Sequence, residues 1–246
     1  MLDIRGKPML QHVLERCRSN DKNVDVLLCT DSHELLSLSS ELGFNSFLTS
    51  KECSSGTARI ASIINKLVID IWLEGEKPLN QKVVEDLLKR TLIINVQADQ
   101  PFLDPNILND FIKNVEKYKD EKFVLTAIYP LKSAESIQDP NVVKVIISDN
   151  GSAIYFSRSP IPYLRNQKPE LWHKFHNYWG HCGIYGYRGD VLSEWESIKK
   201  SNLEDAECLE QLRLIEAGYT IKTIKLNDQV FSVDTKEQLE EARKIM

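Results

Sequence analysis

The chain has 246 residues, of which 42% are hydrophobic and 27% charged, the profile of a soluble protein with a substantial core. A formal net charge of −5 gives no overall basic field, so a nucleic-acid partner held by its phosphates is not expected. The five cysteines are scattered and form no Cys-x-x-Cys pair, which argues against a zinc site or a disulfide scaffold and fits a reducing cytoplasm. No apolar run of membrane-spanning length and no secretory leader is visible, so membrane insertion is not expected.

The amino-terminal third predicts helices alternating with short strands. Leu10, Val13 and Leu14 recur at helical spacing after Pro8, so we expect the chain to open on a helix. Strands are then expected at 24–29 and 44–49, and helices at 34–42, 58–71 and around 83–88. Ser55, Gly56 and Thr57 precede the helix at 58–71, where they either cap the helix or bind an anion or a base edge.

A short apolar run at 92–96 leads directly into a carboxylate, Asp99, and then a proline. Two isoleucines in the run favour a strand covered on both faces. Ligands bind at the carboxyl edge of such sheets, so Gln97 and Asp99 are well placed to meet a magnesium-bound phosphate. The alternative is an ordinary turn in which Asp99 bonds to local backbone.

The second half predicts further strands and helices. Residues 105–115 and 123–129 read as a helix and a strand, which extends the alternation typical of a mostly parallel α/β sheet. Residues 142–147 and 153–157 predict a β-hairpin, and 181–187 another strand. Helices at 190–198, 205–217 and 235–245 and a strand at 219–226 complete the pattern.

Several polar side chains in this half are candidates for a site. Asp234 could share a cation with Asp99, or it could cap the last helix together with Glu237. Alternation along a strand places His181 and Tyr185 on one face, which with Arg158 would suit a polyhydroxylated acid. In the helix expected at 205–217, one face carries Glu210 and its neighbours, and the default interpretation is an exposed charged face. That face is formed by Glu207, Glu210 and Gln211.

Several short motifs occur in one order over nearly the whole chain. They are Gly6-Lys-Pro-Met9, Thr30-Asp31, Ser55-Gly-Thr57, Asn95-Val-Gln-Ala-Asp99, Asp139-Pro-Asn-x-Val-Lys144, Tyr155-Phe-Ser-Arg158, Gly183-Ile-Tyr-Gly-Tyr-Arg188, Leu209-Glu-Gln-Leu-Arg213 and Val233-Asp-Thr235. Together they resemble the 3-deoxy-manno-octulosonate cytidylyltransferase family. The resemblance implies that CTP and 3-deoxy-D-manno-octulosonate (Kdo) give CMP-Kdo and diphosphate, for lipopolysaccharide biosynthesis.

The resemblance also implies a fold and a set of site residues. It implies a single nucleotide-sugar-transferase (Rossmann-like) domain over 1–246, in which 139–190 form a smaller antiparallel part for sugar binding and homodimerisation. Asp99 and Asp234 match the family's Mg²⁺ ligands, and Ser55, Gly56 and Thr57 match its CTP contacts. The residues that match its Kdo contacts are Gln97, Arg158, His181, Tyr185, Glu210 and Gln211.

The chain departs from the family pattern at several points. The family's first strand and its phosphate-binding loop lie before residue 1, so Lys7 does not take the loop lysine's role. We therefore expect weak CTP binding and poor turnover from these residues, a missing core strand, and a longer natural chain as the active enzyme. Ala98, Gln100 and Ser54 replace the family's usual Gly, Glu and Gln, and residues 72–89 look inserted. Two alternatives stay open: a cytidylyltransferase for another 3-deoxy or nonulosonic acid, and a non-catalytic partner that keeps the sugar-acid pocket.

Overall fold

The computed structural model describes residues 2–18, 24–118 and 122–246. The first elements are two short strands, β1 (Asp3–Ile4) and β2 (Lys7–Pro8), which pair antiparallel. They turn through Gly6, whose φ of 81° is readily adopted only by glycine. Helix α1 (Met9–Cys17) follows. The expectation that the chain opens on a helix is therefore wrong, because a hairpin turn precedes the helix that the sequence predicts.

The next elements form a small parallel sheet. Strands β3 (Leu27–Thr30) and β4 (Asn45–Leu48) pair parallel, and α2 (His33–Glu41) connects them. This is the strand-helix-strand unit that the sequence predicts. Its short strands place Thr30 and Asp31 at the carboxyl end of β3.

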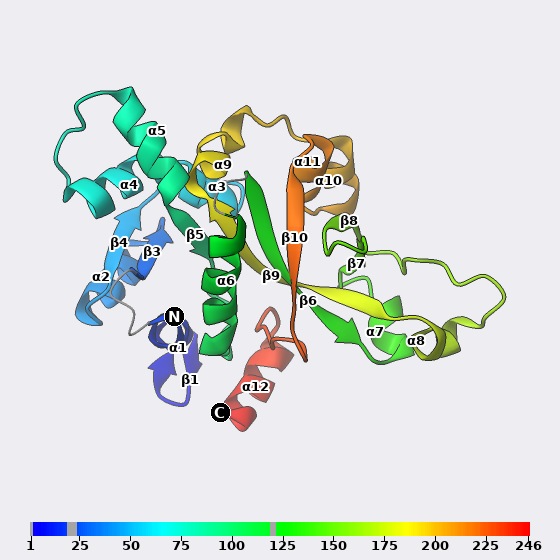
Figure 1. Cartoon of the computed structure of the whole chain (residues 1–246). Coiled ribbons are helices and arrows are strands. Elements are labelled where there is room, and N and C mark those ends of the chain that lie inside the picture. The colour runs from blue at the N-terminus through cyan, green and yellow to red at the C-terminus, as the bar shows by residue number, and fades with distance from the viewer. Residues whose placement is uncertain (1, 19–23, 119–121) are drawn as a thin grey trace.

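The single helix expected at 58–71 is two helices in the structure, α3 (Gly56–Ala61) and α4 (Ile64–Leu73). The Ser62 hydroxyl donates to the carbonyl of Arg59 at 2.8 Å, a local bond of the kind that competes with helix continuation. Helix α5 (Gln81–Arg90) then packs against α4. The segment that looks inserted is therefore part of a helical pair at the end of the molecule that Figure 1 shows at upper left.

The remaining strands form a six-stranded mixed sheet in which the strands follow the order β10-β6-β9-β7-β8, and β5 also pairs with β9. They are β5 (Leu92–Asn95), β6 (Phe123–Leu131), β7 (Lys144–Ile147), β8 (Ala153–Ser157), β9 (Tyr178–Arg188) and β10 (Thr220–Lys225). β10 runs parallel to β6, whereas β9 runs antiparallel to β5, β6 and β7. The α/β class is confirmed, and the sheet is mixed because the long strand β9 lies between strands of the opposite direction.

Apolar side chains cover both faces of the central strand β6, which is buried along nearly its whole length. Val124 and Ile128 join one core with residues of α4, α5 and α9. Leu125 and Ala127 join the other core with Phe111 and further residues of α6 (Pro105–Tyr118), the helix that crosses the front of the sheet in Figure 1. The continuous apolar sequence of β6 follows from this burial on two faces.

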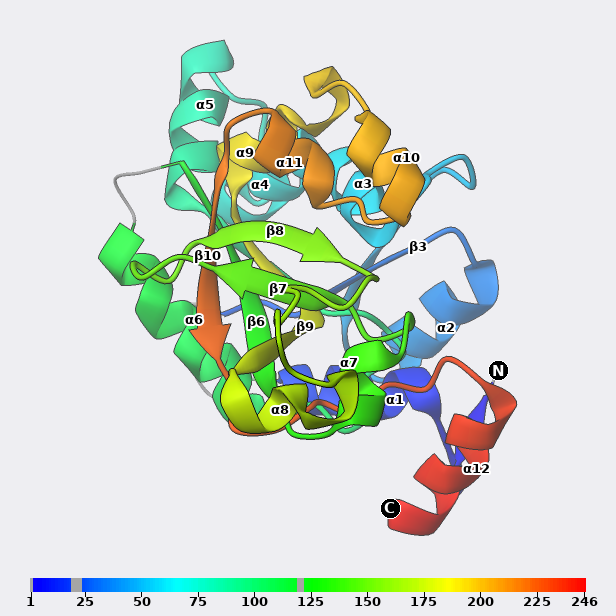
Figure 2. The same ribbon diagram turned by 90° about the vertical axis from the view of Figure 1, so that its right-hand side faces the viewer.

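Short helices and one longer helix complete the chain. They are α7 (Ala134–Gln138), η1 (Pro169–Leu171), α8 (Trp172–Phe175), α9 (Gly189–Ser193), η2 (Trp195–Ser197), α10 (Asn202–Glu207), α11 (Leu212–Glu216) and α12 (Lys236–Ile245). The expectation of one uninterrupted helix at 205–217 is wrong. Cys208 adopts a left-handed conformation with a φ of 53°, and the chain turns between α10 and α11. Figure 2 shows both helices above the β7–β8 hairpin and beside α3.

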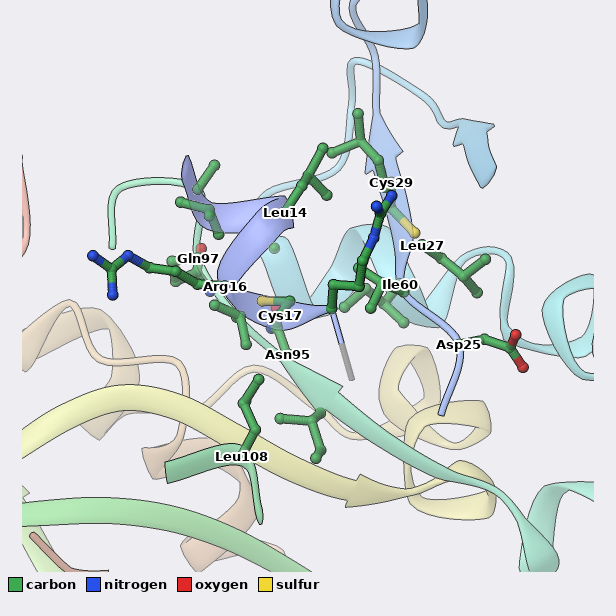
Figure 3. Close-up of a pocket in the computed structure, with 18 of the residues that line it drawn as sticks. Leu14, Arg16, Cys17, Asp25, Leu27, Cys29, Ile60, Asn95, Gln97 and Leu108 are labelled. Carbon is green, nitrogen blue, oxygen red and sulfur yellow. The ribbon is translucent and has the colours of Figure 1, made fainter. Parts of the chain in front are cut away.

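A cavity of about 830 Å³ separates the small sheet from the large one. In Figure 3, Leu27 and Cys29 of β3 lie on one side of it, and Asn95 and Gln97, at the end of β5, lie across it. β3 pairs only with β4, and β5 pairs only with β9, so the edges that face the cavity have no strand partner among the described residues.

Within the described ranges, no helix is both long enough and apolar enough to cross a bilayer.

Candidate active site

Two carboxylates that are distant in sequence meet beyond the carboxyl end of β5. The amide of Val233 donates a hydrogen bond of 2.8 Å to the carbonyl of Asp99, which brings the next residue, Asp234, beside Asp99. Burial and, to a smaller extent, the negative charge of Asp234 together raise the pKa of Asp99 to about 6. The predicted meeting of these two acids is confirmed as geometry.

The pair has the chemistry of a magnesium site. Asp99 Oδ1 is buried and has no hydrogen-bond partner among the described residues. A carboxylate oxygen in this state can bind a cation or a proton. In the part of the chain that the structure describes, no group of three metal-binding side chains occurs. Mg²⁺ commonly binds to one or two carboxylates and takes its other ligands from water and substrate phosphates, so the pair fits this ion.

Asp234 does not cap the last helix. Thr235 is the N-cap of α12, and its side chain forms a capping box with Gln238. The exposed carboxylate of Asp234 instead accepts a hydrogen bond of 2.9 Å from the Ser232 hydroxyl. The alternative in which Asp234 and Glu237 form the cap is therefore wrong, and the Asp234 carboxylate faces Asp99.

The segment Ser55–Gly56–Thr57 begins α3 at the edge of the cavity. Ser55 accepts a hydrogen bond of 3.1 Å from the amide of Ala58, so the capping interpretation is confirmed. Gly56 lies against Gln97: a Cβ at Gly56 would come within 3.1 Å of Gln97 Nε2. Arg59, one turn later, pairs with Asp31 at 3.1 Å. The start of α3 thus contacts the residues that follow the carboxyl ends of β5 and β3.

Thr57 connects α3 to the turn between α10 and α11. Its hydroxyl donates to Glu210 Oε1 at 2.6 Å and lies 3.4 Å from the hydroxyl of Tyr187. Asn95 Nδ2 also donates to the Thr57 hydroxyl, at 3.4 Å. The sequence reasoning missed Asn95, although a buried amide inside an apolar strand was a visible signal. The default interpretation of an exposed helix face is wrong for Glu210, which tertiary hydrogen bonding turns inward, and its predicted contact with Kdo stays a prediction.

The aromatic face of β9 forms as predicted. The ring centroid of Tyr185 lies 5.3 Å from that of His181 and 5.6 Å from that of Tyr187. His181 Nε2 is 2.9 Å from the hydroxyl of Thr126, within hydrogen-bonding distance. Burial lowers the pKa of His181 to about 3, so its imidazole is neutral near pH 7. His181 can therefore offer a hydrogen bond to a ligand but not a charge.

Arg158 is held at the end of β8 by α10. Its Nε donates to the carbonyl of Glu207 at 2.8 Å, and its Nη1 donates to the carbonyl of Pro140 at 3.1 Å. The Glu207 carboxylate accepts from the Ser157 hydroxyl at 2.5 Å and from the amide of Arg158 at 2.8 Å. These bonds fix the guanidinium while leaving other N–H groups for a ligand.

A second cation that the sequence reasoning missed lies close to Arg158. Lys144 is fully buried, and its Nζ donates to the carbonyls of Asp139 at 2.8 Å and Val142 at 2.6 Å. Burial lowers its pKa to about 8. The Asp139–Lys144 motif thus has a structural explanation. The Lys144 side chain bonds to two backbone carbonyls of the same loop, which lies beside Arg158.

Four further polar side-chain atoms are buried without a partner among the described residues, and two of them, Glu210 Oε2 and Gln211 Nε2, belong to adjacent residues. One can only accept when ionised and the other can only donate, so together they match the hydroxyl groups of a sugar. Asp99 also lies near β9, since its charge adds to the burial that raises the pKa of Cys182 to about 12. The carboxylate pair therefore lies beside β9, near Cys182, which packs in the other core from Tyr185.

Comparisons with known proteins agree with this arrangement. A family model described as cytidylyltransferase matches residues 1–224. The chain is similar to the 3-deoxy-manno-octulosonate cytidylyltransferase of Thermodesulfovibrio yellowstonii, with 32% identity over 243 residues that cover 99% of this chain and 89% of the relative. It is also similar to 3-deoxy-manno-octulosonate cytidylyltransferase 2 of Actinobacillus pleuropneumoniae serotype 5b, with 34% identity over 250 residues that cover 100% and 91%.

Solved structures give the same result. A structure of CMP:2-keto-3-deoxy-manno-octonic acid synthetase complexed with CTP is similar to the chain, with a TM-score of 0.82, 32% identity, and coverage of 99% of this chain and 89% of that one. A glucose-1-phosphate thymidylyltransferase structure from Bacillus anthracis has a TM-score of 0.58 and 15% identity, covers 100% of this chain and 85% of that one, and shows the fold alone.

Proposed function

This chain belongs to the 3-deoxy-manno-octulosonate cytidylyltransferase family, and we propose that it joins CTP to Kdo to give CMP-Kdo and diphosphate. The observation that carries the proposal is the meeting of Asp99 and Asp234 just beyond β5, because the same strand end carries Gln97 against Gly56 and joins Asn95 to Thr57 and Glu210. A carboxylate pair in the same fold as hydroxyl-matching groups suits a reaction between a nucleoside triphosphate and a sugar acid.

The reaction is an in-line displacement at phosphorus. The anomeric hydroxyl of Kdo loses its proton and attacks the α-phosphorus of CTP, a new O–P bond forms, and diphosphate leaves with the electrons of the broken bond. Asp99 and Asp234 would hold Mg²⁺. When bound, that ion supplies positive charge against the phosphate oxygens. The raised pKa of Asp99 means that the protein alone stabilises the charged pair poorly, which supports a role for a cation.

The segment at the start of α3 would contact the cytidine. Ser55 and Gly56 line the cavity, and Gly56 allows the backbone to approach Gln97 closely. Backbone N–H groups and hydroxyls at this position can read the edge of a base. The neighbouring Gln97 then lies where the nucleotide and the sugar acid would meet.

The sugar acid would be held by charge at one end and by hydrogen bonds along its length. Arg158 keeps N–H donors for a carboxylate, because backbone carbonyls occupy only its Nε and Nη1 among the bonds that the structure shows. His181, Tyr185, Glu210 and Gln211 would take the hydroxyl groups. The neutral state of His181 suits this role, since a charged imidazole is not required for a hydroxyl partner.

We further propose a homodimer formed through residues 139–190, a cytoplasmic location, and a product used for lipopolysaccharide. Free thiols at all five cysteine positions support a reducing compartment. Along β9, β7 pairs with residues 179–180 and β5 with residues 185–188, so a partner subunit on the β7–β8 hairpin would lie towards the other end of β9 from β5.

The test combines calorimetry with diphosphate release, measured with Mg²⁺, CTP and a panel of acidic sugars. The proposal predicts weak binding of CTP, binding of Kdo, and slow diphosphate release that prefers Kdo. Preference for another 3-deoxy or nonulosonic acid would favour the rival cytidylyltransferase, and Kdo binding without diphosphate release would favour a non-catalytic partner. Absence of both binding and release would contradict the proposal.

A further inference from the structure

One buried hydroxyl joins the nucleotide segment to the sugar-acid pocket. Thr57 is fully buried, and its hydroxyl donates to Glu210 Oε1 at 2.6 Å. A hydroxyl has one proton to donate, and Thr57 gives that proton to Glu210. Asn95 Nδ2 donates to the same oxygen at 3.4 Å, which uses one of its lone pairs. Both bonds hold the Thr57 side chain in one orientation.

The carboxylate that Thr57 holds has a second oxygen with no partner among the described residues. Glu210 Oε2 and the adjacent Gln211 Nε2 are both buried in this state. A buried polar atom without a hydrogen bond is costly, and a ligand hydroxyl relieves the cost by donating to the carboxylate and accepting from the amide. One oxygen of Glu210 is therefore fixed by the protein, and the other is left for a ligand.

Thr57 also belongs to the segment that we assign to the nucleotide. It directly follows Gly56, whose backbone lies against Gln97, and Ser55, whose hydroxyl caps the same helix. A ligand that restrains Ser55 and Gly56 also restrains the Thr57 hydroxyl, which orients Glu210. The Thr57 side chain and its hydrogen bond to Glu210 therefore connect the two proposed substrate sites.

We propose that Thr57 is a positioning residue that couples nucleotide binding to sugar-acid binding through Glu210. This inference rests on the proposed function, because it takes CTP and Kdo as the two ligands. CTP at Ser55 and Gly56 restrains the first turn of α3, Thr57 in that turn holds Glu210 Oε1, and Glu210 Oε2 then meets a sugar hydroxyl. Coupling between two sites is reciprocal, so Kdo strengthens CTP binding by the same factor.

A buried threonine elsewhere provides a matched control. Thr91 is also buried, donates to the carbonyl of Leu87 at 2.8 Å and accepts from Trp72 Nε1 at 2.7 Å. It lies before β5, whereas the candidate site lies after that strand. Replacing either threonine by valine removes a buried hydroxyl, but only the Thr57 change removes the link to Glu210.

The experiment measures Kdo binding by calorimetry with and without saturating Mg²⁺-CTP, for the wild-type chain and for Thr57→Val, Thr57→Ser, Glu210→Gln and Thr91→Val. In the wild type, CTP tightens Kdo binding about fivefold or more. Thr57→Val abolishes this tightening and weakens Kdo binding about tenfold, since it removes a hydrogen bond to a charged group. Thr57→Ser keeps the tightening because it keeps the hydroxyl, and Thr91→Val keeps it while lowering Tm.

Other results overturn the inference. Wild-type tightening in Thr57→Val, or loss of tightening in Thr91→Val, would show that the Thr57 hydroxyl does not carry the coupling. If Thr57→Val does not fold, Glu210→Gln decides, because the inference expects it to lose the tightening. A wild-type chain that binds CTP and Kdo independently overturns the inference alone, whereas a chain that binds neither overturns the proposed function itself.

Discussion

The backbone of Val233 is bonded to the backbone of Asp99 at 2.8 Å, and this contact places the carboxylate of Asp234 next to that of Asp99. Two acids held together by the backbone repel each other when both are ionised. This repulsion lowers the stability of the fold, and a bound cation would remove the repulsion.

We therefore expect Asp99→Asn to stabilise the fold while removing magnesium-dependent activity. The pKa of Asp99 is raised to about 6 from 3.8, so the folded state binds a proton more tightly than the unfolded chain does. Stability from this group is present at low pH and is lost as pH rises from about 4 to 6. Asp99→Asn should raise the free energy of unfolding at pH 7 by roughly 1–2 kcal/mol and flatten its pH dependence in that interval.

Thermal unfolding of the wild type and Asp99→Asn between pH 4 and 8, in chelator, checks this expectation. Asp234→Asn is the matched variant and should recover part of the same stability, since it removes one of the causes of the raised pKa. If the unfolding free energies of the wild type and Asp99→Asn depend on pH in the same way, folding does not raise the pKa of Asp99.

His181 should not titrate within the physiological range. Its pKa is lowered to about 3 by burial, so its neutral ring contributes stability above the unfolded value of 6.5, and that stability is lost as pH falls through 6.5 toward 3. Imidazole NMR signals of His181 should therefore stay constant from pH 8 to 5. The exposed His176 provides a comparison within the same spectrum. A His181 midpoint near 6.5 would contradict the burial of this ring.

The buried pair of Glu204 and Arg213 should hold the α10–α11 turn. Arg213 Nη2 and Glu204 Oε1 lie 2.5 Å apart, and the side chains are only 12% and 8% exposed. Glu204→Ala leaves a buried guanidinium without its partner and should cost about 3–5 kcal/mol of unfolding free energy. It should also weaken Kdo binding, because the same turn carries Glu210. Denaturant unfolding and calorimetry measure the two effects.

Asp205→Ala is the control for that pair. Asp205 pairs with Lys200 on the same helix end, but both side chains are 59% exposed. Exposed pairs contribute about 0–1 kcal/mol, so Asp205→Ala should change stability little and Kdo binding not at all. Equal costs for Glu204→Ala and Asp205→Ala would remove the special role of the buried pair.

Gly56→Ala should weaken CTP binding with little loss of stability. The added Cβ would meet Gln97 at 3.1 Å, and the end of that flexible side chain can move aside. We expect a loss of about tenfold in CTP affinity, since Gln97 is pushed into the site. Adding Gln97→Ala should recover part of the affinity, and a purely additive double variant would show that the two residues do not interact.

The sequence predicts most elements of this fold because their apolar periodicity reflects local burial. Residues 92–95 and 123–131 are strands for that reason, and their apolar residues cover both faces. Strand direction is different, because a strand reads the same in a parallel or an antiparallel pair. The insertion of β9 between β5 and β6 therefore becomes visible only in three dimensions.

The site was predictable where motifs marked it and hidden where tertiary contacts formed it. Asp99, Asp234 and Arg158 stand in the family motifs, and so does Lys144, but the hydrogen bonds of Lys144 and Glu207 to backbone groups become visible only in three dimensions. The turn at Cys208 interrupts a segment with regular helical spacing, and Glu210, two residues later, bonds to Thr57. Periodicity carries no information about a partner 153 residues away.

The most direct test locates the metal. Crystals grown with CTP and Mn²⁺ in place of Mg²⁺ should show one strong anomalous-scattering peak within coordination distance of both Asp99 and Asp234 and of the nucleotide's phosphates, and Asp99→Asn should lose it. A peak that contacts the phosphates but neither carboxylate would contradict the proposal that these two acids hold the ion.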